Sequence, residues 1–132
     1  MDRPTSLIPS NPLETALVAT KKGEMPLAEF LAKLLDSDIA VPSATEIQAD
    51  GSGLRPLQFD KEGTAMVAVF SNLDRAKKFE GSAQYALTIN TRAFLSGLSR
   101  EAGVVVNPGY ADGLDISPEG IRKILRDFAK PA

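Results

Sequence analysis

The sequence lacks two residue types that supply much of the chemistry of protein sites, because it holds 0 cysteines and 0 histidines among 132 residues. Without cysteine the chain has no thiol nucleophile, no disulfide and no thiolate ligand for a metal. Without histidine it has no imidazole base and no imidazole ligand. Any chemistry is therefore restricted to carboxylates, lysines, hydroxyls and the backbone, and we expect neither a cofactor nor a metal site.

Long apolar runs and an excess of positive charge are absent as well. The first residues contain no apolar run of the kind found in signal peptides, and nowhere do about 18 apolar residues follow one another. The formal net charge is −2 and no basic stripe is visible, so we expect neither nucleic acid nor a membrane as a partner. These absences lead us to expect a cytoplasmic protein.

The composition is that of one soluble globular domain, with 43% hydrophobic and 24% charged residues in 132. A domain of this length buries roughly 65–70% of its unfolded surface, so it needs no metal or disulfide to fold. No internal repeat or low-complexity tract divides the sequence. We predict a flexible N-terminal arm at residues 1–10 and one domain at residues 11–130, with no C-terminal domain.

The pattern over residues 103–128 predicts a strand, a turn and a packed helix, and the rest of the chain is organised around it. The run 104–106 is short, apolar and β-branched, and an Asn-Pro-Gly sequence closes it. Ser117 precedes Pro118 in the manner of a helix start. Apolar residues then recur at helical spacing on one face: Ile121, Ile124, Leu125 and Phe128.

The remaining chain alternates helical and strand patterns. Asn11 and Pro12 begin a helix, with Glu14 placed as in a capping box, and Pro26 opens a second helix. Strands are predicted at 38–42, stopped by a proline, and at 57–59, 65–70, 85–89 and 114–116, with a turn at 60–63 and helices at 73–79 and from Asn90 or Thr91 to Ala102. The sequence therefore predicts an α/β (α+β) fold, a mixed β-sheet flanked by helices in a single compact domain.

The order of these patterns resembles the N-terminal domain of the SseB family. The resemblance rests on segments 67–72, 85–89 and 103–109, and the strand that runs into Asn-Pro-Gly is the strongest of them. Segment 38–42, which ends in Val-Pro, is similar too. The resemblance extends from Asn11 to Phe128.

The resemblance implies an α/β domain with no catalytic residues to carry over. The family is named after an enhanced serine sensitivity phenotype and has no established enzymatic activity. Its name coincides with that of a type III secretion translocon component, but nothing in this sequence supports export. On this basis we expect a protein that is not an enzyme.

Asn107, Pro108, Gly109 and Tyr110 form the candidate binding surface. They follow a central strand, where open α/β sheets tend to bind ligands. The same residues also suit a purely structural turn, because proline fixes φ, glycine permits positive φ and an asparagine amide can bond to its own turn. Both interpretations are open at the level of sequence.

Other polar positions fit ordinary structural roles better than chemical ones. Ser117 suits a helix cap, and Asp112 and Asp115 lack the spacing of a calcium loop. Asp36 and Asp38 flank a serine at a helix exit, a setting that favours a turn over acid–base catalysis. None of these positions predicts a metal or catalytic site.

Three functional classes follow. The first is a protein–protein interaction module with an unknown protein partner, present as a monomer or weak homodimer. The alternative is a small-molecule sensor with a pocket beside residues 107–110 and the loop-like segment 43–55, and the third is a carboxylate-dependent hydrolase. An interaction module predicts an exposed apolar patch with a polar rim, a sensor predicts a concave pocket, and a hydrolase predicts two converging carboxylates.

Overall fold

A computed structural model describes residue 9 and residues 11–43, 45–49, 52–78, 85–108 and 113–128. The predicted arm at 1–10 thus lies outside the described residues except for Pro9. In chain order the elements are α1 (Pro12–Lys21), α2 (Leu27–Leu35), β1 (Asp38–Ser43), β2 (Gln58–Lys61), β3 (Thr64–Val69), α3 (Leu73–Lys78), β4 (Tyr85–Asn90), α4 (Thr91–Ser96), β5 (Gly103–Val106), β6 (Leu114–Ile116) and α5 (Pro118–Asp127).

The strands form a mixed arrangement, which confirms the predicted fold class. Four of them make a sheet in the order β2-β3-β5-β6, in which β3 and β5 are parallel and the other pairs are antiparallel. Strands β1 and β4 form a separate antiparallel pair. Ala40 of β1 joins the two sheets, because it exchanges two backbone hydrogen bonds of 2.8 Å with Phe70.

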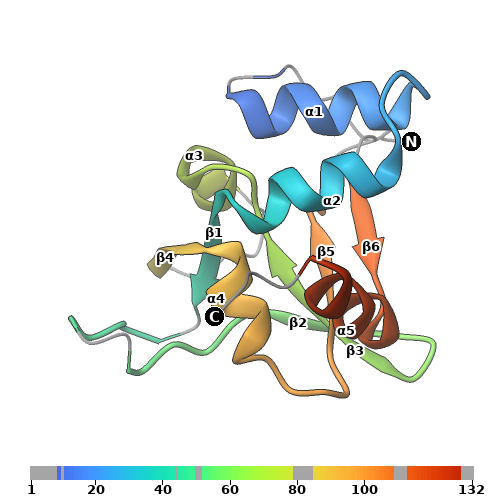
Figure 1. Cartoon of the computed structure of the whole chain (residues 1–132). Coiled ribbons are helices and arrows are strands. Elements are labelled where there is room, and N and C mark those ends of the chain that lie inside the picture. The colour runs from blue at the N-terminus through green and yellow to red at the C-terminus, as the bar shows by residue number, and fades with distance from the viewer. Residues whose placement is uncertain are drawn as a thin grey trace, which may run out of the picture.

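The main core lies between the four-stranded sheet and the helices. Figure 1 shows α4 and α5 in front of the sheet and α2 above them, with α1 packed over α2. Alternate residues of the parallel strands face these helices, because successive side chains of a strand point to opposite faces. The buried residues that share this core include Leu17, Phe30, Leu34, Leu35, Val67, Val69, Phe94, Val104, Val106, Ile121 and Ile124.

A smaller core occupies the opposite face of the sheets. Ala68 and Phe70 point away from the main core and pack with Ala40 of β1 and Ala76 of α3. Toward β2 the same face is more open, and Phe59 is 37% exposed there. Helix α3 therefore covers only part of this face.

Two strand ends differ from the sequence-based prediction. Strand β1 continues through Pro42, which is in register with Ala86, and ends at Ser43 instead of stopping at the proline. The fixed φ of proline is compatible with an extended strand, so the missing N–H does not end β1 here. The hairpin turn is shorter than predicted: Glu62 and Gly63 have φ of 52° and 87°, as a tight two-residue turn requires.

Helix α4 is also shorter than its apolar pattern predicts. It begins at the Asn90 cap, whose side chain accepts a hydrogen bond from the Ala93 N–H, and ends before Gly97. Leu98 and Ala102 lie beyond the helix, although Ala102 is buried. Glycine costs about 1 kcal/mol in a helix interior, which favours an end at this position.

The loop-like segment 43–55 is anchored at its base. Ser43 is fully buried, and its hydroxyl oxygen accepts hydrogen bonds from the N–H groups of Thr45, at 3.3 Å, and Arg55, at 3.0 Å. Thr45 in turn donates from its hydroxyl to the Gly53 carbonyl at 2.5 Å. One buried hydroxyl thus closes the two ends of this segment onto β1.

Candidate functional site

Asn107 lies at the end of β5, and its side chain is fully buried. Its Oδ1 accepts a hydrogen bond from the Ser71 N–H and its Nδ2 donates to the Ser71 hydroxyl, both at 2.9 Å. Its φ is 55°, in the left-handed region that asparagine tolerates better than most residues. The Asn107 side chain therefore joins the C-terminal ends of the parallel strands β3 and β5.

The rest of the predicted binding surface is only partly visible. Pro108 is half-buried, whereas Gly109 and Tyr110 lie outside the described residues. That residues 107–110 bind a partner or ligand stays a prediction. If they do, Asn107 contributes by shaping the turn, because its side chain points inward to Ser71.

A shallow depression of about 380 Å³ lies beside this turn. Pro108 and Val105 line it from the end of β5, and Phe59 lines it from β2. Lys61 donates to Asp115 across its rim, and both side chains are about half exposed. Two of the three charged side chains that line the depression, Lys61 and Asp115, are thus paired with each other.

A buried polar network lies next to Asn107. Glu14 of α1 is fully buried and accepts hydrogen bonds from Arg75, Asn72 and Ser71. Asn11 closes the network by donating to the Ser71 carbonyl at 3.0 Å. Each carboxylate oxygen of Glu14 has an internal donor, as a buried charge requires, so the network serves to dock α1 onto the strand ends.

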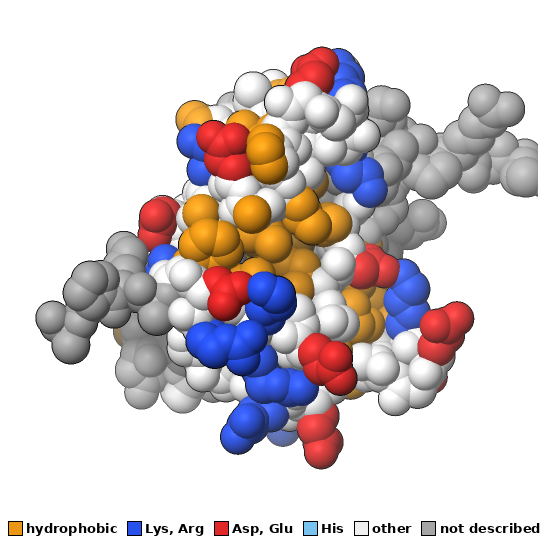
Figure 2. Space-filling model, turned by 45° about the vertical axis from the view of Figure 1, so that its right-hand side comes forward, with side chains coloured by type: hydrophobic (Ala, Val, Ile, Leu, Met, Phe, Trp, Pro, Cys, Tyr) orange, Lys and Arg blue, Asp and Glu red, His pale blue; other side chains and the backbone are white. Residues whose placement is uncertain are grey.

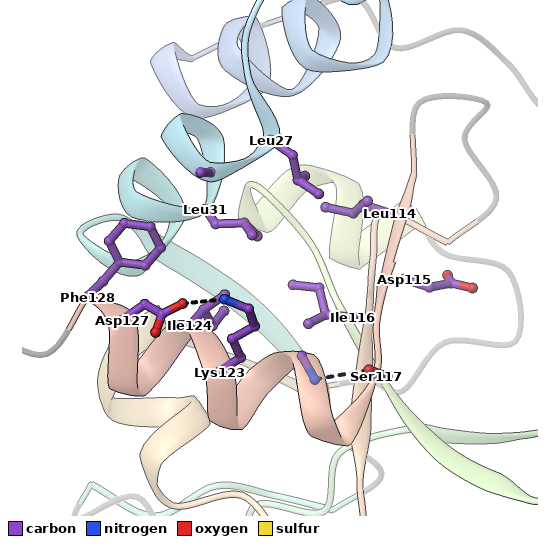
Figure 3. Close-up of a pocket in the computed structure, with 12 residues that line it drawn as sticks. Leu27, Leu31, Leu114, Asp115, Ile116, Ser117, Lys123, Ile124, Asp127 and Phe128 are labelled. Carbon is purple, nitrogen blue, oxygen red and sulfur yellow. Dashed lines mark hydrogen bonds and ion pairs between the residues drawn. The ribbon is translucent and has the colours of Figure 1, made fainter.

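An apolar groove of about 400 Å³ lies between α2, β6 and α5. Figure 3 shows Leu27 and Leu31 of α2, Leu114 and Ile116 of β6, and Ile124 of α5 around this space. Leu27 is 50% exposed, although it belongs to the apolar stripe of its helix. Figure 2 shows a patch of apolar side chains on this face, with charged side chains above and below it. We call this opening the α2–α5 groove.

The helix α5 places charged residues along one side of the α2–α5 groove. Lys123 donates to Asp127 at 2.6 Å, and Arg126 lies 3.7 Å from the same carboxylate. The hydrogen bond from Lys123, aided by the charges of both cations, lowers the pKa of Asp127 below its ordinary value of 3.8. Asp127 therefore stays ionised, and the two cations share a single anion.

Arg92 of α4 connects the two helices that border the groove. Its Nη1 donates to the Phe128 carbonyl at the end of α5, at 2.6 Å. Its Nη2 donates to Asp36 at the end of α2, at 3.3 Å. One guanidinium thus bonds to the ends of both helices that border the α2–α5 groove.

The other polar candidates do not assemble into a site. Ser117 caps α5 by accepting the Gly120 N–H at 3.0 Å, as its sequence position predicts. Asp36 pairs with Arg92, Asp38 begins β1, and Asp112 lies outside the described residues. Within the part of the chain that the structure describes, no group of three or more acidic side chains could hold a metal ion.

Sequence reasoning identified the groove residues but not the groove. Leu27 and Leu31 belong to the apolar stripe of the helix that Pro26 opens, and Ile124 and Phe128 belong to the stripe predicted after Pro118. Their stripes are wider than the core that they cover, since Leu27 and Leu31 flank the buried Phe30 and remain accessible. An apolar stripe that is wider than the buried face of its helix is therefore the feature of the sequence that indicates an exposed apolar surface.

The comparisons with known proteins identify the family. Neither a curated protein nor a solved structure matches the chain. Among the described helices, none is long and apolar enough to cross a membrane. A family model for the SseB protein N-terminal domain matches residues 13–123, which is most of the chain. The protein therefore belongs to the SseB N-terminal domain family.

Proposed function

We propose that this domain works in the cytoplasm as a non-catalytic protein–protein interaction module, with the α2–α5 groove as its docking surface. The observation that carries the proposal is the exposure of apolar side chains from three elements around one groove. Exposed apolar patches with a polar rim mark interaction sites in soluble proteins. Leu27, 50% exposed, is the most accessible of these side chains.

The hydrogen bonds of Arg92 to the ends of α2 and α5 support the same proposal. A docking surface binds more tightly when it is held in its bound shape before the partner arrives. The hydrogen bonds of Arg92 to Phe128 and Asp36 fix the ends of α5 and α2, which form two sides of the groove. Arg92 thus links the two helices that form the sides of the groove.

The arrangement of carboxylates at the groove gives little support to a hydrolase. Asp115 and Asp127 both line it, but they lie on different sides of the view in Figure 3. Each accepts a hydrogen bond from a lysine, Asp115 from Lys61 and Asp127 from Lys123. A hydrolytic pair needs two carboxylates that converge on one point.

A substitution in the groove tests the proposal. Leu27→Glu puts a charge into the groove and keeps α2 intact, because a carboxylate is favourable in the first turn of a helix. Leu73→Glu is the matched control, since Leu73 is 37% exposed and begins α3, whereas the groove is formed by other elements. Affinity capture from a lysate of the source organism should recover one protein with the native chain and with Leu73→Glu, and lose it with Leu27→Glu.

Two results would contradict the interaction proposal. One is the absence of any reproducible partner, and the other is capture that Leu27→Glu leaves unchanged.

The depression beside Pro108 favours the second candidate function, a small-molecule sensor, because it lies at the ends of the parallel strands. A thermal-shift screen with metabolites distinguishes the sensor from the interaction module. Only the sensor predicts that a metabolite raises the unfolding temperature of the native chain and of Leu27→Glu alike.

A further inference from the structure

Strand β6 is the terminal strand of its sheet and borders the α2–α5 groove. Of the strands in the described residues, β5 alone is paired with β6. A terminal strand presents backbone N–H and C=O groups that another chain can pair with. Among the described residues, the apolar groove and an unpaired edge of the sheet thus lie side by side.

The backbone groups that point outward from β6 belong to Asp115. A methyl group placed on Gly103 of β5 would lie 2.5 Å from the carbonyl oxygen of Ile116, so this carbonyl faces β5. In an antiparallel pair the direction of the backbone groups alternates along the strand. The N–H and C=O of Asp115 therefore face away from β5, toward the free edge.

The side chains of β6 alternate in the opposite sense. Figure 3 shows Leu114 and Ile116 pointing into the α2–α5 groove and Asp115 pointing away from it. A strand added beside β6 would follow the same pleat. Every second side chain of that added strand would therefore point into the space between α2 and α5.

The charged side chains of α5 indicate which charge the added strand carries. Helix α5 carries three exposed cations, Arg122, Lys123 and Arg126, against two carboxylates, Glu119 and Asp127. Lys123 and Arg126 both approach Asp127, and Arg122 donates to the Arg100 carbonyl. Figure 2 shows a group of basic side chains below an apolar patch. An incoming segment with acidic residues next to its apolar ones complements this border.

We infer that the α2–α5 groove binds an extended segment of a partner protein, which pairs with β6, inserts alternate apolar side chains and presents acidic residues to α5. The inference rests on the proposed function and specifies its partner. A helical segment satisfies its own backbone groups, so it would make no use of the outward N–H and C=O of Asp115. A second copy, paired about a two-fold axis at Asp115, would place two carboxylates opposite each other.

Selection of short random peptides displayed on phage against the full chain tests this inference. The enriched sequences should alternate apolar and polar residues and contain an excess of Asp and Glu. One enriched peptide is then synthesised with N-methyl groups on alternate residues, in both registers. Methylation of the residues that donate to β6 should weaken binding at least about tenfold, whereas the other register should not.

Variants of β6 and α5 give a second readout. Asp115→Pro removes the outward N–H and should weaken peptide binding about tenfold, whereas Asp115→Ala, which keeps the N–H, should not. Lys123→Glu should weaken binding severalfold and make its salt dependence smaller. If Asp115→Pro does not fold, the N-methylated peptides still test the backbone pairing.

Several outcomes would overturn the inference. They are enrichment of peptides with helical spacing, equal binding by both methylated registers, no enriched peptide, or self-association of the chain that Leu27→Glu abolishes. Helical peptides that still require Leu27 would leave the proposed docking function standing. Binding of peptides or proteins that ignores Leu27→Glu would instead overturn the docking function itself.

Discussion

Glu14 and Arg75 form a two-point ion pair that joins α1 to α3. Arg75 Nε lies 2.6 Å from one carboxylate oxygen of Glu14, and Arg75 Nη2 lies 2.8 Å from the other. Glu14 is fully buried, and the side chain of Arg75 is 15% exposed. The position of α1 on the domain therefore depends on a charge that has no access to solvent.

Loss of one partner of this pair should be costly. We expect Glu14→Ala to lower the free energy of unfolding by about 3–5 kcal/mol, because the Arg75 guanidinium stays buried without its anion. Replacing both residues, as Glu14→Leu with Arg75→Leu, should cost less than Glu14→Ala alone. Urea denaturation measures both values. If Glu14→Ala lowers the free energy of unfolding by less than about 1 kcal/mol, the pair contributes no more than an exposed surface ion pair, and the prediction is wrong.

The same residue shows what the sequence predicts and what it does not. The capping pattern predicts that Asn11 accepts the Glu14 N–H, and this bond is confirmed at 2.8 Å. The Glu14 carboxylate bonds to residues about 60 positions away, such as Ser71 and Arg75. Caps and periodicity depend on near neighbours in the chain, so the order of elements was predictable, whereas this pairing depends on how the elements pack.

The candidate site follows the same division. The strand that ends at Asn107 was predicted from its apolar run and its turn residues, and its left-handed backbone fits that turn. The α2–α5 groove was not predicted, because it exists only where Leu27 of α2, Ile124 of α5 and the residues of β6 come together. The spacing of apolar residues along one helix or strand does not determine how far apart two helices pack.

Asn107 should be sensitive to substitution for two separable reasons. Asn107→Gly removes the side-chain hydrogen bonds to Ser71 but tolerates the φ of 55°, so a loss of about 1–3 kcal/mol is expected. Asn107→Ala should cost about 1 kcal/mol more, because alanine is strained in the left-handed region. Thermal unfolding of the two variants measures the difference. Equal stability would show that the backbone relaxes out of this conformation.

Asp127 should titrate at a lower pH than an ordinary aspartate. Its pKa in the folded protein is lowered mainly by the hydrogen bond from Lys123. The ionised carboxylate therefore stabilises the folded state at pH values above the unfolded pKa near 3.8, and this stabilisation is lost as the pH falls through the lower folded pKa. Carbon NMR of the carboxyl group measures its midpoint, and Lys123→Ala should raise that midpoint toward the ordinary value. Lys61→Ala is the control. An unchanged midpoint in Lys123→Ala would contradict the pairing.

Gly103 should tolerate no larger residue, because β5 and β6 pass too close to it. A methyl group at this position would lie 2.5 Å from the Ile116 carbonyl oxygen and 2.7 Å from the sulfur of Met66. The methionine can move, but the carbonyl belongs to the strand ladder, so we expect Gly103→Ala to cost about 1–3 kcal/mol.

Gly97→Ala is the matched control for Gly103→Ala, because its added methyl would lie 3.8 Å from the nearest atoms, an ordinary contact, and its φ of −92° suits alanine. It should leave stability unchanged or raise it by about 0.4–1 kcal/mol. Urea denaturation of the two variants separates crowding from the general effect of replacing glycine. If Gly103→Ala is as stable as Gly97→Ala, the carbonyl of Ile116 does not face β5. The outward direction of the Asp115 backbone groups would then be wrong, and with it the pairing of a partner strand to β6.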